Sequence, residues 1–420
     1  MRALVLPAVL ALASCTHDVA VFDRVDVAPA RDLDILYVFD NSADRGSYDA
    51  LASQLGELTA QLASVDGQLP SLHVGVTTTD LGTRGRLDAA PAPPVGDCAG
   101  DGDGGRLVAL DAGVAFGSFL EDLRGPGDTR VRNFDGDLAP ALARFTNPRP
   151  GAASAGCEYT QPLEAMRRAL DPATNPDFLR PGALLSVVFL ASQDDCSLAH
   201  AAMLDPGNAA LGPPFTFRCT EQGVVCDPDD PRRPGAHRNC RPRDGSPFLV
   251  DVAEYQRVLA QAKPDARDVS VAAVAGPRSA FEVRDIGVPV LAPSCQGPGG
   301  SAMPAVRIGA LIDSLGGALI DGCTQADAYR RIAAPIVARQ RSCFAHLRAA
   351  DGDDCTVTET TGGAAIVLAR CGDAGPPCWR TFADPVACPD GDGDHMAIAI
   401  DRGNTSAPAG ARVEATCTVH

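Results

Sequence analysis

Three oxygen-bearing side chains, Asp40, Ser42 and Asp44, occur at alternating positions directly after the apolar run Ile35–Phe39. Carboxylate and hydroxyl oxygens are the ligands that a hard cation such as Mg²⁺ prefers, whereas thiolate and imidazole groups suit softer metals. No nucleophile–base pair lies near them in the sequence. This stretch therefore predicts a binding site, with no sign of catalytic chemistry.

The elements that must position these side chains are a strand and the helix that follows it. The apolar run is rich in aromatic and β-branched residues, and four leucines at helical spacing come after it (Leu51, Leu55, Leu58 and Leu62). A buried strand that delivers polar side chains from its carboxyl end into a loop before a helix is the layout of an α/β ligand site.

Further strands and helices alternate along the chain. We expect strands at 72–77, 184–191, 269–275 and 318–321, and helices at 251–263, 305–315 and 326–341. The run 184–191 is apolar throughout, which is typical of a central parallel strand buried on both faces. The alternation predicts an α/β fold built on a doubly wound, mostly parallel sheet.

Composition narrows the possible partners. The chain of 420 residues is 45% hydrophobic and 21% charged, which predicts a folded protein. Its formal net charge of −17 makes nucleic acid an unsuitable partner, because phosphate binding needs clustered Lys and Arg. The seven histidines show no paired spacing of the kind found in zinc hydrolases.

The amino-terminal residues predict export. An apolar run from Ala3 to Ala13 follows Arg2, and it is too short to span a bilayer, which takes about 20 residues. Small residues directly before Cys15 resemble a lipobox, in which the cysteine is lipidated. The alternative is an ordinary cleaved signal that ends near Cys15. Of 15 cysteines, removing Cys15 leaves 14, an even number available for disulfides in an oxidising compartment.

Two Gly- and Pro-rich, Cys-bearing insertions interrupt the alternation, at about 80–156 and 192–250. Both leave the carboxyl ends of predicted strands, so we expect them to wall the same cleft as Asp40. The chain is thus predicted to comprise a signal peptide (1–15), a tether (16–31), an α/β domain (32–343) and a small disulfide-stapled β region (344–420). Fourteen cysteines leave the pairing open.

Residues 34–343 resemble a von Willebrand factor type A domain, most closely those of exported bacterial lipoproteins with two Cys-bearing insertions. The order and spacing of five segments carry the resemblance. These are 34–42 (DILYVFDNS), 74–80 (VGVTTTD), 156–165 (GCEYTQPLEA), 187–197 (VVFLASQDDCS) and 271–277 (VAAVAGP).

The resemblance implies a metal-ion-dependent adhesion site that binds Mg²⁺, with Mn²⁺ or Ca²⁺ as alternatives, and takes a carboxylate from a partner protein. Asp40 and Ser42 match the first two ligand positions, and Asp44 stands where the family has Ser. Thr160 lies on the loop that supplies a threonine, with Glu158 as an alternative. Where the family has Asp after the fourth strand, this chain has Ser192, with Asp194 two residues later.

These departures admit two interpretations. In one, the carboxylate has moved and the ion remains. In the other, the ion is lost, and Asp40 and Ser42 survive as a loop-closing or helix-capping pair. A second candidate is Asp390, Asp392 and Asp394, whose alternating carboxylates are those of a Ca²⁺ loop, although the Glu that ends an EF-hand loop is missing.

We therefore expect an exported, lipid-anchored envelope protein that binds another protein and is not an enzyme. Thr16, directly after the lipobox cysteine, is not the Asp that retains lipoproteins in the inner membrane, which favours the outer membrane. One alternative is a structural envelope protein with a vestigial metal site. Another is a phosphotransferase-type hydrolase using Asp40, which Ser42 in place of a second Asp disfavours.

Overall fold

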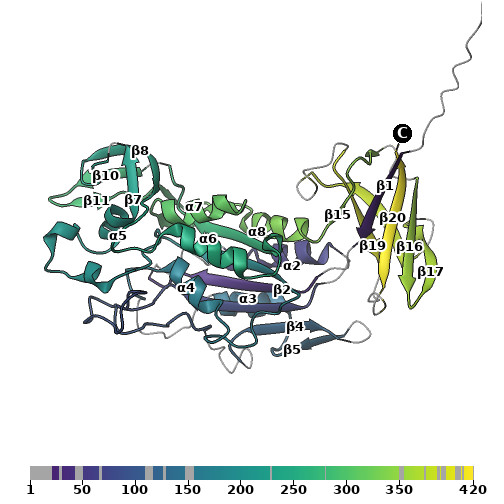
Figure 1. Ribbon diagram of the computed structural model, residues 1–420, viewed down its shortest axis with the longest axis horizontal. Coiled ribbons are helices and arrows are strands. Elements are labelled where there is room, and N and C mark those ends of the chain that lie inside the picture. Colours follow the sequence, from purple (N-terminus) through teal and green to yellow (C-terminus); the bar gives the residue numbers. More distant parts are fainter. Residues whose placement is uncertain are drawn as a thin grey trace, which may run out of the picture.

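The structure is a computed structural model of the chain (Figure 1). It describes residues 21–27, 31–42, 51–65, 69–108, 117–125, 129–146, 156–227, 229–279, 281–349, 354–372, 375–385, 388, 394–402, 408 and 411–419. Four predicted functional residues lie outside these ranges, namely Cys15, Asp44, Asp390 and Asp392. The predicted signal peptide, 1–15, lies outside them as well.

One seven-stranded sheet carries the candidate site. Its order is β14 (Ala318–Asp321), β9 (Val269–Ala275), β6 (Leu184–Leu190), β2 (Leu33–Phe39), β3 (Leu72–Thr78), β4 (Leu120–Arg124) and β5 (Arg130–Arg132). The first five strands pair in parallel, and β4 and β5 add antiparallel. The strands β2, β3, β6 and β9 are buried at every position. They carry apolar side chains on both faces, and these are shielded from water only when the sheet lies between two layers.

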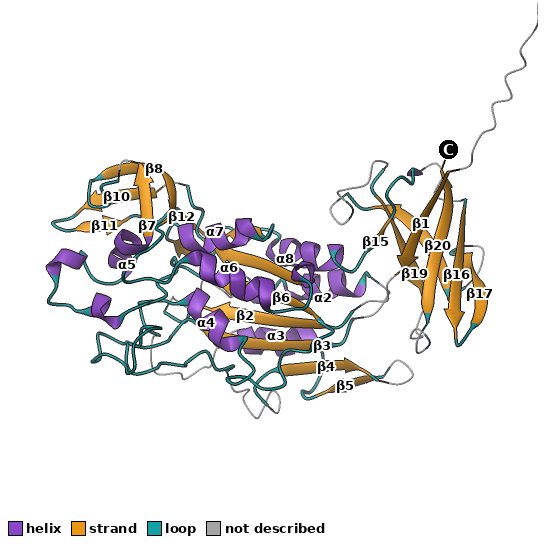
Figure 2. Cartoon of the chain, viewed as in Figure 1, coloured by secondary structure: helices purple, strands orange, loops and turns teal. Residues whose placement is uncertain are grey.

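Helices form those two layers (Figure 2). One core joins the sheet to α2 (Leu55–Ala63), α3 (Leu138–Thr146) and α8 (Ala328–Ala338). The opposite core joins it to α4 (Pro162–Ala169), α6 (Val252–Gln261) and α7 (Val306–Ser314). The predicted leucine stripe is part of the first core: Leu51, Leu55, Leu58 and Leu62 are all buried.

The predicted fold class, an α/β fold with a doubly wound, mostly parallel sheet, is wrong for this chain. Strands account for 34% and helices for 22%, and several sheets are mixed or antiparallel. A second seven-stranded sheet lies apart from the first (Figure 1). The prediction rested on the buried parallel strands within 34–341 and treated the insertions as loops. In the structure, residues 224–242 and 281–302 form further strands that pair antiparallel, and Val21–Val27 joins the carboxyl-terminal sheet.

The second sheet is almost closed into a barrel. Its order is β1 (Val21–Val27), β20 (Arg412–Val419), β16 (Cys355–Thr361), β17 (Ala364–Arg370), β18 (Cys378–Ala383), β19 (Met396–Asp401) and β15 (Ser342–Cys343). Its two ends, β1 and β15, are in contact. The structure here differs from the predicted tether, because Val21–Val27 pairs antiparallel with Val413–Val419. The amino-terminal segment is thus a strand of the carboxyl-terminal sheet.

The second insertion and the residues after β9 form smaller elements at the far end of the first sheet. A four-stranded antiparallel sheet has the order β11 (Pro289–Leu291), β10 (Phe281–Asp285), β8 (Gly235–Pro242) and β7 (Val224–Asp227). Near it lie the helix α5 (Thr216–Gly223) and the strand β12 (Cys295–Gly297), as Figure 2 shows. β12 pairs antiparallel with β13 (Gly300–Ala302). Three short 3₁₀ helices complete the described elements, η2 (Ala201–Leu204), η3 (Ala209–Leu211) and η4 (Ala266–Asp268).

Seven disulfides use all fourteen cysteines other than Cys15. The pairs are Cys98–Cys157, Cys196–Cys219, Cys226–Cys240, Cys295–Cys323, Cys343–Cys388, Cys355–Cys417 and Cys371–Cys378. The prediction of disulfides is confirmed, and their number places the protein in an oxidising, exported or extracellular environment. Among the described residues, no helix has both the length and the apolar character needed to cross a membrane.

Candidate functional site

At the carboxyl edge of the first sheet, one buried carboxylate joins two neighbouring strands. Asp40 directly follows β2, and its Oδ1 accepts hydrogen bonds from the backbone N–H and the hydroxyl of Ser42, at 3.0 and 2.6 Å. Its Oδ2 accepts the same two bonds from Ser192, which follows β6, at 3.0 and 2.7 Å. Asp40 is fully buried. The structure therefore brings together three of the predicted site residues, Asp40, Ser42 and Ser192.

The second insertion extends this network. Gln193 donates from Nε2 to Ser42 Oγ at 3.3 Å, and its Oε1 accepts from the hydroxyl of Thr216, at the start of α5. The edge of the sheet is thereby tied to the helix that carries one end of the Cys196–Cys219 disulfide.

The donor set can be compared with what a hard cation needs. A carboxylate has about four lone-pair sites, and Asp40 uses all of them for hydrogen bonds. The hydroxyl oxygens of Ser42 and Ser192 donate to Asp40 and keep lone pairs of their own. A cation at this edge would therefore have to be held through the two serine oxygens, with Asp40 supplying the negative charge. Mg²⁺ binding stays a prediction.

Asp194 lies close by but faces a different partner. Its carboxylate accepts the backbone N–H groups of Val306, Arg307 and Ile308 at 2.9–3.1 Å, which are the first residues of α7. It thus satisfies donors that the first helical turn leaves free. Burial raises the pKa of Asp194 to about 6, while the backbone N–H groups of Arg307 and Ile308 and the Arg307 charge act in the opposite direction.

The neighbouring carboxylate, Asp195, holds another helix. Its Oδ1 accepts from the backbone N–H of Leu163 in α4 at 3.1 Å, and its Oδ2 accepts from Nε and Nη2 of Arg307 at 3.1 and 3.0 Å. Both side chains of this ion pair are buried, with 1% of Arg307 and none of Asp195 exposed. Asp195 and Arg307 were not among the site residues predicted from the sequence. Two adjacent carboxylates after an apolar strand were the available signal.

The other predicted ligands that the structure describes form no hydrogen bond with the Asp40 carboxylate. The Thr160 hydroxyl donates to the backbone oxygen of Asp194 at 3.2 Å, and Glu158 is exposed. Asp44 lies outside the described residues. Of the predicted calcium loop, only Asp394 is described, and its Oδ2 accepts the backbone N–H of Ala349 at 2.8 Å. The roles of all these residues as metal ligands stay predictions.

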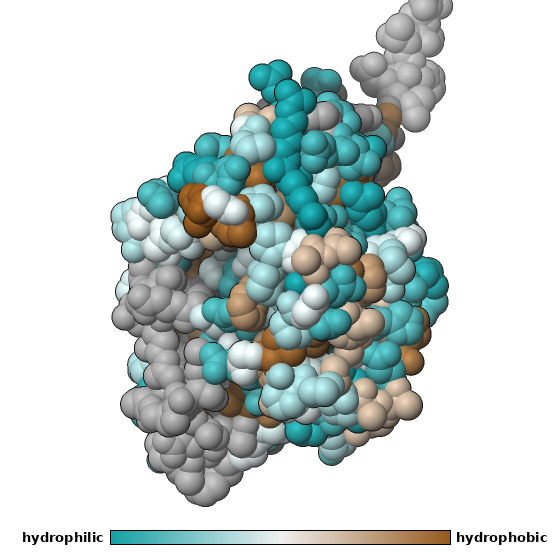
Figure 3. All heavy atoms as spheres, turned by 90° about the vertical axis from the view of Figure 1, so that its left-hand side faces the viewer, coloured by the Kyte–Doolittle hydropathy of each residue, from teal (hydrophilic) through white to brown (hydrophobic). Residues whose placement is uncertain are grey.

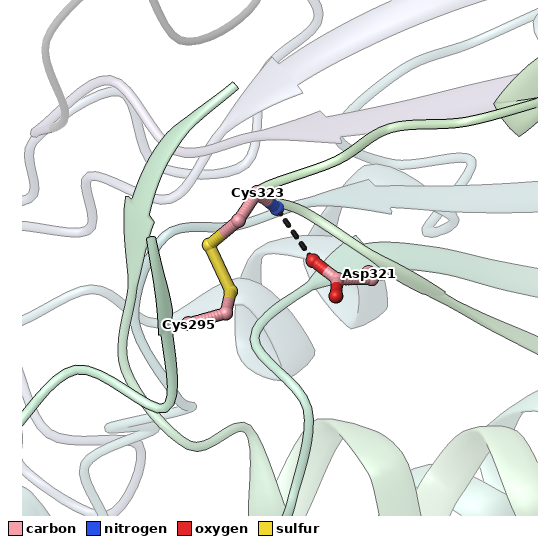
Figure 4. Close-up of side chains that lie close together, drawn as sticks. All are labelled: Cys295, Asp321 and Cys323. Carbon is pink, nitrogen blue, oxygen red and sulfur yellow. Dashed lines mark hydrogen bonds between the residues drawn. A yellow bond between two sulfur atoms is a disulfide. The ribbon is translucent and has the colours of Figure 1, made fainter. Parts of the chain in front are cut away.

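Two other groups bring possible ligand atoms within 4.8 Å of one another: Cys295, Asp321 and Cys323, and Cys371, Cys378 and Asp401. In each group the two cysteines form a disulfide, so neither sulfur is a thiolate that could bind a metal. Figure 4 shows the first group, in which Asp321 Oδ1 accepts the Cys323 N–H at 2.8 Å. The carboxylate shapes the turn that carries the disulfide.

A pocket opens where the two insertions meet. Its volume is about 690 Å³, and its lining comes from the first insertion (88–90 and 92–95) and from the second (201, 202 and 204–206). Alanine, proline, valine and leucine make up most of the lining, with the carboxylates of Asp88 and Asp205 beside them. Figure 3 faces this end of the molecule and shows hydrophobic patches among hydrophilic ones.

The pocket walls are fixed to each other. The backbone N–H groups of Arg86 and Leu87 donate to the backbone oxygens of Leu198 and Ala199, at 2.8 and 3.0 Å. Asp88 Oδ2 accepts the N–H of Ala201 at 2.6 Å. A shared core of both insertions lies behind the lining, composed of Cys98, Cys157, Tyr159, Cys196, Leu198, Ala201, Met203, Leu204, Cys219 and Leu249. The insertions therefore form one preorganised surface.

Comparisons with known proteins assign this chain to no family. No family model and no curated protein matches it. Among solved structures, the chain is similar to the crystal structure of the human COPII-coat protein Sec24c, with a TM-score of 0.29 and 9% sequence identity. That match covers 93% of this chain and 39% of the Sec24c chain. At this TM-score the likeness carries no argument about fold or function.

Proposed function

We propose that this chain is an exported binding protein that recognises another protein through the pocket between its two insertions. The observation that carries the proposal is that both insertions, far apart in the sequence, line one pocket and share one disulfide-bonded core. Loops ordered in advance lose little conformational entropy on binding, which favours affinity. Within this proposal, Cys15 is the lipid attachment site, and the outer membrane is the location.

The chemistry of the lining defines the partner contact. Exposed apolar side chains such as Ala90, Pro93, Pro94 and Ala202 would lose water on contact with an apolar side chain of the partner. The surrounding protein is acidic, so complementary charge would speed the approach of a basic partner.

The Asp40 edge could supply a second contact. A partner carboxylate would be recognised there only with a cation on the serine oxygens, because Asp40 alone repels it. Calorimetric titration with Mg²⁺ and with Mn²⁺, on the wild-type chain and on Asp40→Ala, tests this part. Binding of one ion that Asp40→Ala abolishes supports a metal-dependent contact. No heat in the wild type leaves Asp40 as a structural carboxylate and supports the structural alternative for this edge.

Photo-cross-linking in intact cells tests recognition by the pocket. The photoreactive residue p-benzoylphenylalanine replaces Ala90 or Ala202, one on each wall, or Arg267 as a control on a distant surface, where 89% of the side chain is exposed. The proposal expects the same cross-linked partner from positions 90 and 202 and none from 267. No adduct from either wall, or equal adducts from all three positions, would contradict it.

A further inference from the structure

The strand β17 has one hydrogen-bonding edge that no described strand covers along most of its length. On one side, β16 pairs with β17 from Ala364 to Leu368. On the other side, β18 pairs with it in parallel only at Ala369 and Arg370. Figure 1 shows β17 at the outer side of the second sheet, far from the insertions. Residues 364–368 therefore belong to a regular strand with one open side.

The turn between β16 and β17 decides which backbone groups face that open side. Gly362 and Gly363 both have a positive φ, of 58° and 88°, as a two-residue type I′ turn requires. Such a turn closes on a hydrogen-bonded pair, and hydrogen-bonded pairs then recur at every second position of the ladder. The N–H and C=O groups of Ala365 and Val367 consequently point away from β16. Their spacing matches the backbone of another extended segment.

The side chains at this edge are apolar and exposed. Val367 is 70% exposed and Ile366 is 53% exposed, and no residue of 364–369 is charged. Other sheet edges of the chain carry residues that discourage pairing: β5 has an arginine on each side of Val131, and β11 begins with Pro289. Residues 364–369 contain neither a charge nor a proline, so this edge is suited to pairing.

The same edge of a second copy offers the required groups in the required register. In an antiparallel pair centred on Ile366, Ala365 lies opposite Val367 of the second copy, so the outward groups of both residues are paired. A register centred on Val367 would need Ala369, which already pairs with β18. Within 364–368 no charged residues face each other, although each chain has a net charge of −17. Two acidic chains can therefore meet here without opposing like charges.

We propose that two copies of this chain associate through β17, which joins their second sheets into one continuous sheet. The two-fold axis passes between the two Ile366 side chains, which lie opposite each other. An edge of five residues is smaller than the roughly 20–30 residues per partner of a stable interface, so the dimer is weak and reversible. The pocket between the insertions lies at the other end of the molecule and stays open in the dimer (Figure 1).

Sedimentation velocity of the full chain tests the association. The wild type should shift reversibly from monomer to dimer between about 1 μM and 1 mM. Val367→Pro removes an N–H group that pairs with the second copy and none that pairs with β16, so it should weaken dimerisation about tenfold or more. Val367→Lys gives the same comparison if the proline disturbs the hairpin. Val131→Lys is the matched control on the edge strand β5, where Val131 is 58% exposed, and should leave the association unchanged.

Introduced cysteines test the register. Ile366→Cys should form a disulfide between two copies under oxidising conditions, because side chains directly opposite each other on antiparallel strands are close enough for one. Ala365→Cys should not, because the same residue of the second copy lies two positions further along its strand. Non-reducing electrophoresis distinguishes the two results. Equal cross-linking by both variants, or a wild type that stays monomeric over the whole range, would overturn the proposal, and in the second case the edge would belong to a strand of a different protein.

Discussion

Ser192 donates both its backbone N–H and its hydroxyl to the same oxygen of Asp40, at 3.0 and 2.7 Å. Ser42 makes the same pair of bonds to the other oxygen. Asp40 therefore connects the loops after β2 and β6, two strands that pair along their whole length. A carboxylate in this position closes the edge of the sheet whether or not a cation binds to the serine oxygens.

Asp40→Asn should lower the free energy of unfolding by about 3 kcal/mol, because the new amide N–H₂ faces donors of Ser42 or Ser192 and leaves them buried without an acceptor. Chemical denaturation monitored by circular dichroism measures the change. Asp265→Asn is the control: Asp265 is solvent-exposed and accepts from Arg267, so its replacement should change stability far less. Equal effects of the two substitutions would disprove a structural role for Asp40.

The sequence predicted those parts of the fold that local patterns specify. The buried strands Leu33–Phe39, Leu184–Leu190 and Val269–Ala275 are continuous apolar runs, and the sequence identified all three. The strand Val21–Val27 escaped prediction because its partner is Arg412–Val419, at the other end of the chain. Pairing over such a separation leaves no local periodicity.

In the candidate site too, local patterns could be predicted from the sequence and long-range contacts could not. Asp40, Ser42 and Ser192 come together because each lies at or just after the end of a predicted strand. The partners of Asp194 could not be inferred, because the N–H groups that it accepts lie 112–114 residues further along the chain. A carboxylate after a strand has the same appearance in the sequence whether it binds a cation or caps a helix.

Arg307→Met should destabilise the protein by about 3–5 kcal/mol, since it leaves the Asp195 carboxylate buried without its counter-charge. Arg241→Met breaks a pair in which both side chains are 60% exposed and should cost less than about 1 kcal/mol. Thermal and urea unfolding of both variants compares the two pairs. A small loss for Arg307→Met would show that water or another residue reaches Asp195.

Glu164 should make stability depend on pH. Burial raises the pKa of this carboxyl group. The hydrogen bonds and charges of Arg167 and Arg168 lower it by more, so the pKa lies below its usual value of 4.5. The folded state then binds fewer protons than the unfolded state as pH falls through that range. Its contribution to stability is present above about pH 4.5 and is lost at lower pH.

Glu164→Gln should therefore destabilise the protein most at neutral pH, and the gap to the wild type should shrink as the pH falls below about 4.5. Urea denaturation at several pH values between 3 and 7 provides the measurement. A gap that stays constant over this range would show that the loss comes from packing and hydrogen bonding alone.

Removal of the Cys98–Cys157 disulfide should loosen the insertion surface. The bridge closes a separation of 59 residues, so the double substitution Cys98→Ser/Cys157→Ser should cost about 4 kcal/mol by the chain-entropy estimate. Cys371→Ser/Cys378→Ser removes a disulfide in the other sheet whose cysteines are only 7 residues apart. This double substitution should lower the free energy of unfolding by about 2 kcal/mol. Hydrogen exchange should increase around 86–88 and 198–201 only in the first variant. Unchanged exchange there would contradict a role for this disulfide in ordering the pocket walls.

The central claim is that the pocket between the insertions recognises another protein, and an affinity measurement tests it most directly. The partner identified by cross-linking is purified and titrated against the wild-type chain, Ala202→Trp and Arg267→Ala. Ala202 is exposed on the pocket wall, so a tryptophan there fills the pocket without disturbing the core. The account predicts at least about tenfold weaker binding for Ala202→Trp and wild-type affinity for Arg267→Ala. Wild-type affinity in Ala202→Trp would contradict it.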